Sequence, residues 1–233
     1  MNKKEIALKI KRQRSPDPAS AHWKTYNLKA KPADRILDLL ERIRANRDDS
    51  LAFRSNCGHG ICGSDAMNIN GSNRLACRTL LADLGFPDRV VIRPLAGYAV
   101  KKDLVVHEEE LAHLAPELDL EFHPDKDNPE EISQEQNNQL ERAVNCIECG
   151  CCQSACPITW DKKRFPGPQM LTRVARYIFD YRDSKTSKRL RLINSYCSLW
   201  NCQTMYNCVE VCPQEINITA LLSALKSRTL ESD

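Results

Sequence analysis

Cysteine carries the strongest chemical signal in this sequence. The chain of 233 residues holds 12 cysteines, fewer than a secreted disulfide scaffold would have but more than an ordinary globular protein. From Cys146 it reads CIECGCCQSACP, which fits the spacing C-x2-C-x2-C-x3-C-P. Three cysteines at intervals of three converge on one cubane iron-sulfur cluster, while the fourth reaches a second cluster. Zinc binding by CxxC pairs is the alternative, but four consecutive matches followed by a proline favour iron and sulfide.

A partial copy of this run lies near the C-terminus. It reads CQTMYNCVEVCP from Cys202, so that Met205 stands where the second cysteine belongs. The fourth cysteine of each run ligates the other cluster, and a neutral thioether does not replace a thiolate. We therefore predict one set of four ligands and one set of three: Cys146, Cys149, Cys152 and Cys212 for a 4Fe-4S cluster, and Cys156, Cys202 and Cys208 for a 3Fe-4S cluster. In the alternative interpretation Met205 only packs, and a second 4Fe-4S cluster takes a ligand other than cysteine.

An earlier, glycine-rich stretch carries a different pattern. Cys57-Gly-His-Gly-Ile-Cys62-Gly-Ser-Asp65, followed by Cys77, matches the C-x4-C-x2-C…C spacing of a 2Fe-2S site with Asp65 in the third position. Its glycines let the backbone approach the sulfides closely. Asp65 either binds iron or caps the loop.

Three further residues near these motifs stay outside the predicted ligand sets. We expect His59 to be a hydrogen-bonding residue of the first loop instead of a ligand, and Cys151 to pack against a cluster. Cys197 receives no assignment.

The elements around these motifs change character along the chain. Alternating or β-branched runs predict strands at residues 5–13, 22–28, 89–95 and 103–107, and an apolar 3,4-spaced face predicts a helix at 33–46. The glycine-rich stretch 56–77 is predicted to be a loop without regular structure. An acidic, proline-punctuated segment at 107–131 suits a linker, and helical patterns follow at 130–145, 168–182, 185–195 and 217–228. We predict an α+β protein with two domains, 1–106 and 107–233.

Composition narrows the functional classes. The 34 Lys and Arg residues nearly balance the 31 Asp and Glu residues, giving a net charge of +3, so nucleic acid is not an expected partner. The N-terminus has no apolar core typical of a secretory signal, and no run is apolar enough for a membrane-spanning helix. We expect a reducing compartment, in which clustered cysteines bind metal or carry out redox chemistry.

The order of the three motifs resembles the iron-sulfur subunits of the succinate dehydrogenase and fumarate reductase family, over essentially the whole chain. The segments CGHGICGSD, LAC and NCVEVCP carry the resemblance. It implies a plant-type ferredoxin-like (β-grasp) domain followed by an all-helical, bacterial ferredoxin-like domain. It also implies that electrons from succinate pass from FAD on a flavoprotein subunit through the 2Fe-2S, 4Fe-4S and 3Fe-4S clusters to a quinone.

The same resemblance implies that the catalytic residues, FAD and any haem belong to partner subunits. Membrane anchor subunits are expected to hold the protein peripherally on the cytoplasmic face of the bacterial inner membrane. A zinc-binding adaptor is the alternative from another functional class.

The expected quinone contacts are Pro157, Trp160 and Met205. Ile158, a single tryptophan and Gln203 depart from the Pro-Ser, Trp-pair and histidine pattern of ubiquinone-reducing relatives. Trp160 is read equally well as an anchor contact. Ubiquinone, menaquinone and net fumarate reduction all remain open.

Overall fold

The computed structural model describes residues 3–108, 118–125, 131–161, 165–195 and 198–231. Its backbone divides into two compact units. Unit 1 comprises Met1–His107 together with the short turn Ile147–Ser154, and unit 2 comprises Glu108–Cys146 and Ala155–Asp233. The domain ranges 1–106 and 107–233 stay a prediction.

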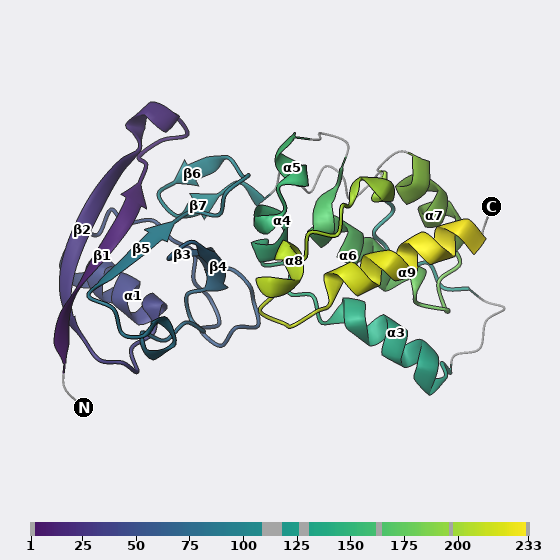
Figure 1. The fold of residues 1–233 in the computed structure, drawn as a ribbon, viewed down its shortest axis with the longest axis horizontal. Helices are drawn as coiled ribbons and strands as arrows, with labels where there is room; N and C mark the ends of the chain where they lie inside the picture. The colour runs from purple at the N-terminus through teal and green to yellow at the C-terminus, as the bar shows by residue number, and fades with distance from the viewer. Residues whose placement is uncertain (1–2, 109–117, 126–130, 162–164, 196–197, 232–233) are drawn as a thin grey trace. The chain divides into compact units, whose positions relative to one another are not determined.

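Unit 1 is built on a five-stranded sheet in the order β2-β1-β5-β3-β4 (Figure 1). The strands are β1 (Lys4–Arg12), β2 (His22–Ala30), β3 (Ala66–Ile69), β4 (Ser72–Leu75) and β5 (Arg89–Arg93). β1 pairs with β2 antiparallel along its full length and with β5 in parallel. A separate ribbon of β6 (Val100–Lys102) and β7 (Val105–Val106) and the 3-10 turns η1 (Pro18–Ser20) and η2 (Ala82–Leu84) complete the unit.

The core of unit 1 follows from the alternation read in the sequence. Ile6, Leu8 and Ile10 of β1 are buried on one face of the sheet, because successive side chains of a strand point to opposite faces. The helix α1 (Ile36–Asn46) lies against the sheet in Figure 1. It buries Ile36, Leu37, Leu39, Leu40 and Ile43.

The prediction of an irregular loop over all of 56–77 is wrong in its second half. β3 and β4 form an antiparallel hairpin there, in which Ile69 pairs with Ser72. The Asn70-Gly71 turn between them has φ angles of 51° and 92°, and this dipeptide favours the tight turn whose twist matches the strands. The glycine that suggested irregular backbone is therefore the residue that makes a regular hairpin.

Unit 2 is helical in its described segments apart from an isolated bridge between Pro124 and Asp183. α6 (Gly167–Ile178) packs against α3 (Gln134–Val144), α7 (Thr186–Ser195) and α9 (Ile218–Glu231). The short helices α5 (Ile158–Asp161) and α8 (Asn207–Glu210) and the turn η4 (Leu199–Asn201) also belong to unit 2, whereas the short helix α4 (Cys151–Ala155) lies in unit 1 apart from its last residue. Within the described residues, no helix combines the length and apolarity needed to cross a membrane.

One buried arginine holds residues 118–125, which lie within the predicted linker, against the helices of unit 2. Arg189 on α7 has no exposed surface and pairs with the carboxylate of Asp183. It also donates to the carbonyls of Asp119, at 2.8 Å, and Glu121. Since a buried guanidinium needs partners for its fork of donors, this arrangement fixes the described residues 118–125 against the helices.

Candidate iron-sulfur centres

The first cysteine loop presents backbone N–H groups to a sulfur atom. Gly58, Gly60 and Gly63 adopt φ angles of 69°, 76° and 68°, a region that side chains rarely occupy. The resulting loop lets the N–H groups of His59 and Cys62 donate to Sγ of Cys57, each at 3.4 Å. These bonds, that from His59 foremost, lower the pKa of Cys57 to about 6. The loop therefore stabilises a thiolate, the form that binds iron.

Asp65 lies at the end of this loop with one carboxylate oxygen still to be satisfied. The residue is 3% exposed, and its Oδ2 accepts from the backbone N–H of Cys77 at 2.6 Å. Its Oδ1 is buried without a hydrogen-bond partner among the described residues. A buried carboxylate oxygen without a partner lowers the stability of the fold, so Oδ1 is suited to be a metal ligand. The cap interpretation of Asp65 thus fits Oδ2, and the ligand interpretation fits Oδ1.

Cys77 is the most buried of the predicted 2Fe-2S cysteines, at 4% exposure. Burial, and after it the neighbouring Asp65, raises the pKa of the Cys77 thiol to about 12. Iron bound here would displace this proton, since only the thiolate is a ligand.

Two positioning contacts of the first loop were missed in the sequence. Nη1 of Arg35, just before α1, donates to the carbonyl of Gly58 at 2.9 Å, while its Nη2 pairs with Asp38 at 2.7 Å. The hydroxyl of Ser64 lies 3.2 Å from Sγ of Cys62. The serine lies within the motif and gave a local signal, whereas nothing in the sequence links Arg35 to Gly58.

The second motif is a tight turn entering α4. Glu148 and Gly150, on either side of Cys149, have positive φ angles of 56° and 79°. Cys149 and Cys152 are 8% and 7% exposed and belong to unit 1 with the turn, whereas Cys146 and Cys212 belong to unit 2. Cys151 is fully buried, as expected for a packing residue, and Cys197 lies outside the described residues.

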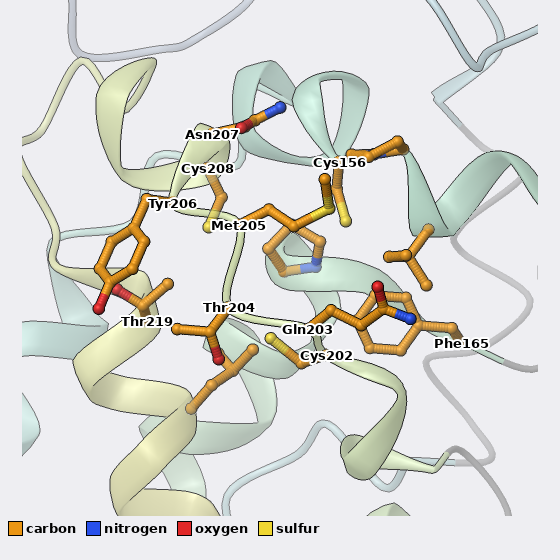
Figure 2. Close-up of a pocket in the computed structure, with 14 residues that line it drawn as sticks. Cys156, Phe165, Cys202, Gln203, Thr204, Met205, Tyr206, Asn207, Cys208 and Thr219 are labelled. Atoms are coloured by element: carbon orange, nitrogen blue, oxygen red, sulfur yellow. The ribbon is translucent and has the colours of Figure 1, made fainter.

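The three cysteines of the third set line one recess within unit 2. Figure 2 shows the side chains of Cys156, Cys202 and Cys208 pointing into it from different segments of the chain. Burial raises the pKa of Cys156, and burial followed by the proximity of Cys202 raises that of Cys208 to about 11. Positively charged iron would relieve the mutual repulsion of these sulfurs as thiolates, so the donor set fits a cluster.

Two long-range hydrogen bonds assemble this recess. Nδ2 of Asn207 donates to the carbonyl of Ala155 at 3.2 Å, which places α8 next to the segment that carries Cys156. Nζ of Lys226 on α9 donates to the carbonyl of Cys202 at 3.2 Å. Neither contact was predicted from the sequence.

Only two of the three residues predicted to contact quinone line the recess of the third cysteine set. Pro157 and Met205 line the recess, whereas Trp160 is absent from its lining. Met205 is 51% and Trp160 55% exposed, so neither side chain is buried in the hydrophobic core. Among the described residues, no three His, Cys, Asp or Glu side chains are arranged to hold a single metal ion.

Comparison with known families identifies the two halves separately. Residues 7–113 match a family model described as a 2Fe-2S iron-sulfur cluster binding domain. Residues 142–216 match one described as a 4Fe-4S dicluster domain. With the cysteine geometry above, these matches define an iron-sulfur protein with an N-terminal 2Fe-2S part and a C-terminal cubane-cluster part, in a fold of mixed helix and strand.

Similarity over most of the chain defines the family. A succinate dehydrogenase iron-sulfur subunit from Coxiella burnetii is 37% identical over 200 residues, covering 84% of each chain. A fumarate reductase iron-sulfur subunit from Haemophilus influenzae is 33% identical over 84% of this chain and 82% of its own. A chain in the structure of the Mycobacterium smegmatis Sdh1 complex in the apo form matches with a TM-score of 0.87 and 29% identity, covering 99% of this chain and 97% of that one.

The chain belongs to the family of succinate dehydrogenase and fumarate reductase iron-sulfur subunits. This confirms the family that the sequence predicted. It also confirms the predicted role, that of the electron-transferring iron-sulfur subunit of a succinate:quinone oxidoreductase.

Proposed function

We propose that this protein conducts electrons from the FAD of a succinate-oxidising flavoprotein subunit to a membrane quinone through three clusters, in the order 2Fe-2S, 4Fe-4S and 3Fe-4S. The observation that carries this proposal is the recess in which three cysteines meet beside Met205 (Figure 2). Three thiolates and one neutral thioether are the donor set expected where a cubane lacks one iron.

The 2Fe-2S cluster is assigned to Cys57, Cys62, Asp65 and Cys77. The unpartnered Oδ1 of Asp65 and the N–H groups directed at Cys57 support the assignment. Hydrogen bonds to sulfur stabilise the more negative, reduced state of a cluster and so raise its potential. This loop therefore tunes the centre as well as holding it.

The cubane centres are assigned to the remaining motif cysteines. Cys146, Cys149, Cys152 and Cys212 are proposed to hold the 4Fe-4S cluster, and Cys156, Cys202 and Cys208 the 3Fe-4S cluster. The spacing of the two runs supports this division. We further assign residues 1–106 to a plant-type ferredoxin-like β-grasp domain and 107–233 to a bacterial ferredoxin-like domain.

The partners in this proposal are a flavoprotein subunit and membrane anchor subunits at the cytoplasmic face of the inner membrane. Dicarboxylate chemistry belongs to the flavoprotein, and any haem belongs to the anchor. Pro157, Met205 and the exposed indole of Trp160 are the proposed contacts of the quinone or the anchor. An indole has an apolar body and a polar N–H, which suits a surface between lipid and water.

Purification of the complex from its native membrane tests the proposal. Succinate is expected to bleach the visible absorbance of the clusters, and added quinone is expected to restore it. Parallel assays with ubiquinone and menaquinone analogues identify the acceptor, and reduced quinone with fumarate tests the reverse direction. A chain that co-purifies without a flavoprotein, or that succinate leaves oxidised, would contradict the proposed function.

A further inference from the structure

The turn that carries two proposed 4Fe-4S ligands packs within the N-terminal unit. Ile147–Ser154 belongs to unit 1, together with the first cysteine loop and the β3–β4 hairpin. The contacts that hold it there involve Gly63 and Asn73, neither of which is a proposed iron ligand.

Gly63 leaves no space between the first cysteine loop and this turn. A Cβ added at Gly63 would lie 2.7 Å from the carbonyl oxygen of Ile147 and 2.9 Å from Cβ of Cys149. Both distances are shorter than nonbonded carbon contacts permit, and the φ of +68° is also suited to glycine. The backbone next to Cys62 therefore touches the side chain of Cys149 directly.

Asn73 makes the second contact. Its side chain on β4 is 6% exposed, and its Nδ2 donates to the carbonyl of Cys151 at 3.0 Å. Its Oδ1 accepts from Nδ2 of Asn68 on β3 at 2.9 Å. The amide is thus held by the hairpin on one side and fixes the cysteine turn on the other.

A third close approach lies on the same turn. A Cβ at Gly150 would lie 2.9 Å from the hydroxyl oxygen of Tyr98 and 3.3 Å from Cδ1 of Leu95. Backbone at Gly63, a side-chain amide at Asn73 and the surface beside Gly150 thus fix the turn at three points. Fixation at three points defines its position and not only its attachment.

We propose that Gly63 and Asn73 are positioning residues that set the distance for electron transfer between the 2Fe-2S centre and the 4Fe-4S centre. This inference rests on the proposed function, because it requires iron at Cys62 and Cys149. In the step concerned, one electron leaves the reduced centre of the first loop and is accepted by the oxidised centre of the turn, and no bond or proton is exchanged. Gly63 follows Cys62 in the sequence, and the Cβ that it lacks would lie 2.9 Å from Cβ of Cys149, so the first loop and the turn meet next to one proposed ligand of each centre.

Gly63→Ala and Gly85→Ala form a matched pair for the test. Both glycines have a positive φ, +68° and +74°, but a Cβ at Gly85 has nothing within 4 Å. The two variants therefore share the backbone strain of alanine in this region, and only Gly63→Ala pushes the turn away. Asn73→Leu removes the hydrogen bond from the side-chain amide to the carbonyl of Cys151 without adding volume at Gly63.

The measurement is the microwave power that half-saturates the EPR signal of the reduced 2Fe-2S centre in the full chain within its complex. A fast-relaxing neighbouring cluster raises this power steeply as the distance shortens. In protein that retains the 2Fe-2S signal, we expect a several-fold drop in Gly63→Ala and in Asn73→Leu, and the wild-type value in Gly85→Ala.

Wild-type half-saturation power in both Gly63→Ala and Asn73→Leu would overturn the inference and leave the proposed function intact. Equal drops in Gly63→Ala and Gly85→Ala would also overturn it, because strain alone would then explain the effect. If Gly63→Ala does not fold, Asn73→Leu against the wild type decides. A wild-type protein without a 2Fe-2S signal would refute the proposed function, and this inference with it.

Discussion

Replacement of Asp65 by asparagine separates the two roles that its oxygens suggest. Asparagine keeps an oxygen to accept from the N–H of Cys77, now held at 2.6 Å by Oδ2. It removes the negative charge and places an amide NH2 where the unpartnered Oδ1 lies. If Oδ1 binds iron, the variant loses a ligand but retains the loop's hydrogen bond.

The structure sets the expected magnitudes. Loss of the 2Fe-2S centre lowers the iron content from about nine to about seven atoms per chain. The hydrogen bond to Cys77 changes from charged to neutral, which reduces the free energy of unfolding by roughly 1 kcal/mol. Asp65→Ala leaves that N–H buried and unpaired, which costs about 1.5–3 kcal/mol in addition to the iron.

Iron analysis, EPR of the dithionite-reduced protein and urea unfolding are the assays. Asp65→Cys is the matched variant, because it supplies a thiolate ligand but no oxygen for Cys77. We expect Asp65→Cys to keep the 2Fe-2S signal and Asp65→Asn to lose it. The reverse pattern, full iron content in Asp65→Asn together with destabilisation in Asp65→Cys, would show that this residue only caps the loop.

Three further predictions follow from the same geometry. Met205→Cys adds a thiolate at the recess, so the three-iron centre should become a four-iron centre. The iron content should rise by one atom per chain, and the EPR signal of the oxidised three-iron cluster should disappear. An unchanged EPR signal would refute the alignment of the two cysteine runs. In the iron-free chain Cys57, with a pKa of about 6, is about 90% thiolate at pH 7. Iodoacetamide should therefore label Cys57 before Cys77, at a rate that falls as the pH drops through 6, and mass spectrometry measures the labelling of each cysteine. Equal labelling rates for the two cysteines would contradict the stabilisation of the Cys57 thiolate by the loop's N–H groups. Arg189→Met strands the buried carboxylate of Asp183 and should cost about 3–5 kcal/mol in urea unfolding, whereas a change below 1 kcal/mol would show that the pair adds little.

Periodicity predicted the regular elements well where one face of an element is buried. The expected strand at 5–13 is β1 (Lys4–Arg12), and the expected helix at 33–46 is α1 (Ile36–Asn46). Both bury every apolar residue of one face, so the pattern and the packing agree. The hairpin at Asn70-Gly71 was missed although its turn signal was present, because the nearby glycines of the cysteine loop were read as one irregular stretch.

Contacts between distant segments could not be predicted in the same way. The sequence shows that Gly63 favours unusual backbone angles, but it does not show that Ile147 and Cys149 occupy the space beside it. Arg35 reads as an ordinary residue before a helix, and its bond to Gly58 depends on how the loop folds back. Motif spacing predicts which residues are ligands, whereas their positioning depends on tertiary contacts that have no local pattern.

The central claim is that these cysteines bind iron-sulfur clusters. Metal and acid-labile sulfide analysis of anaerobically purified protein tests it most directly. The proposed centres predict about nine irons and about ten sulfides per chain, in a brown protein. Stoichiometric zinc without sulfide, in a colourless and folded protein, would contradict the account.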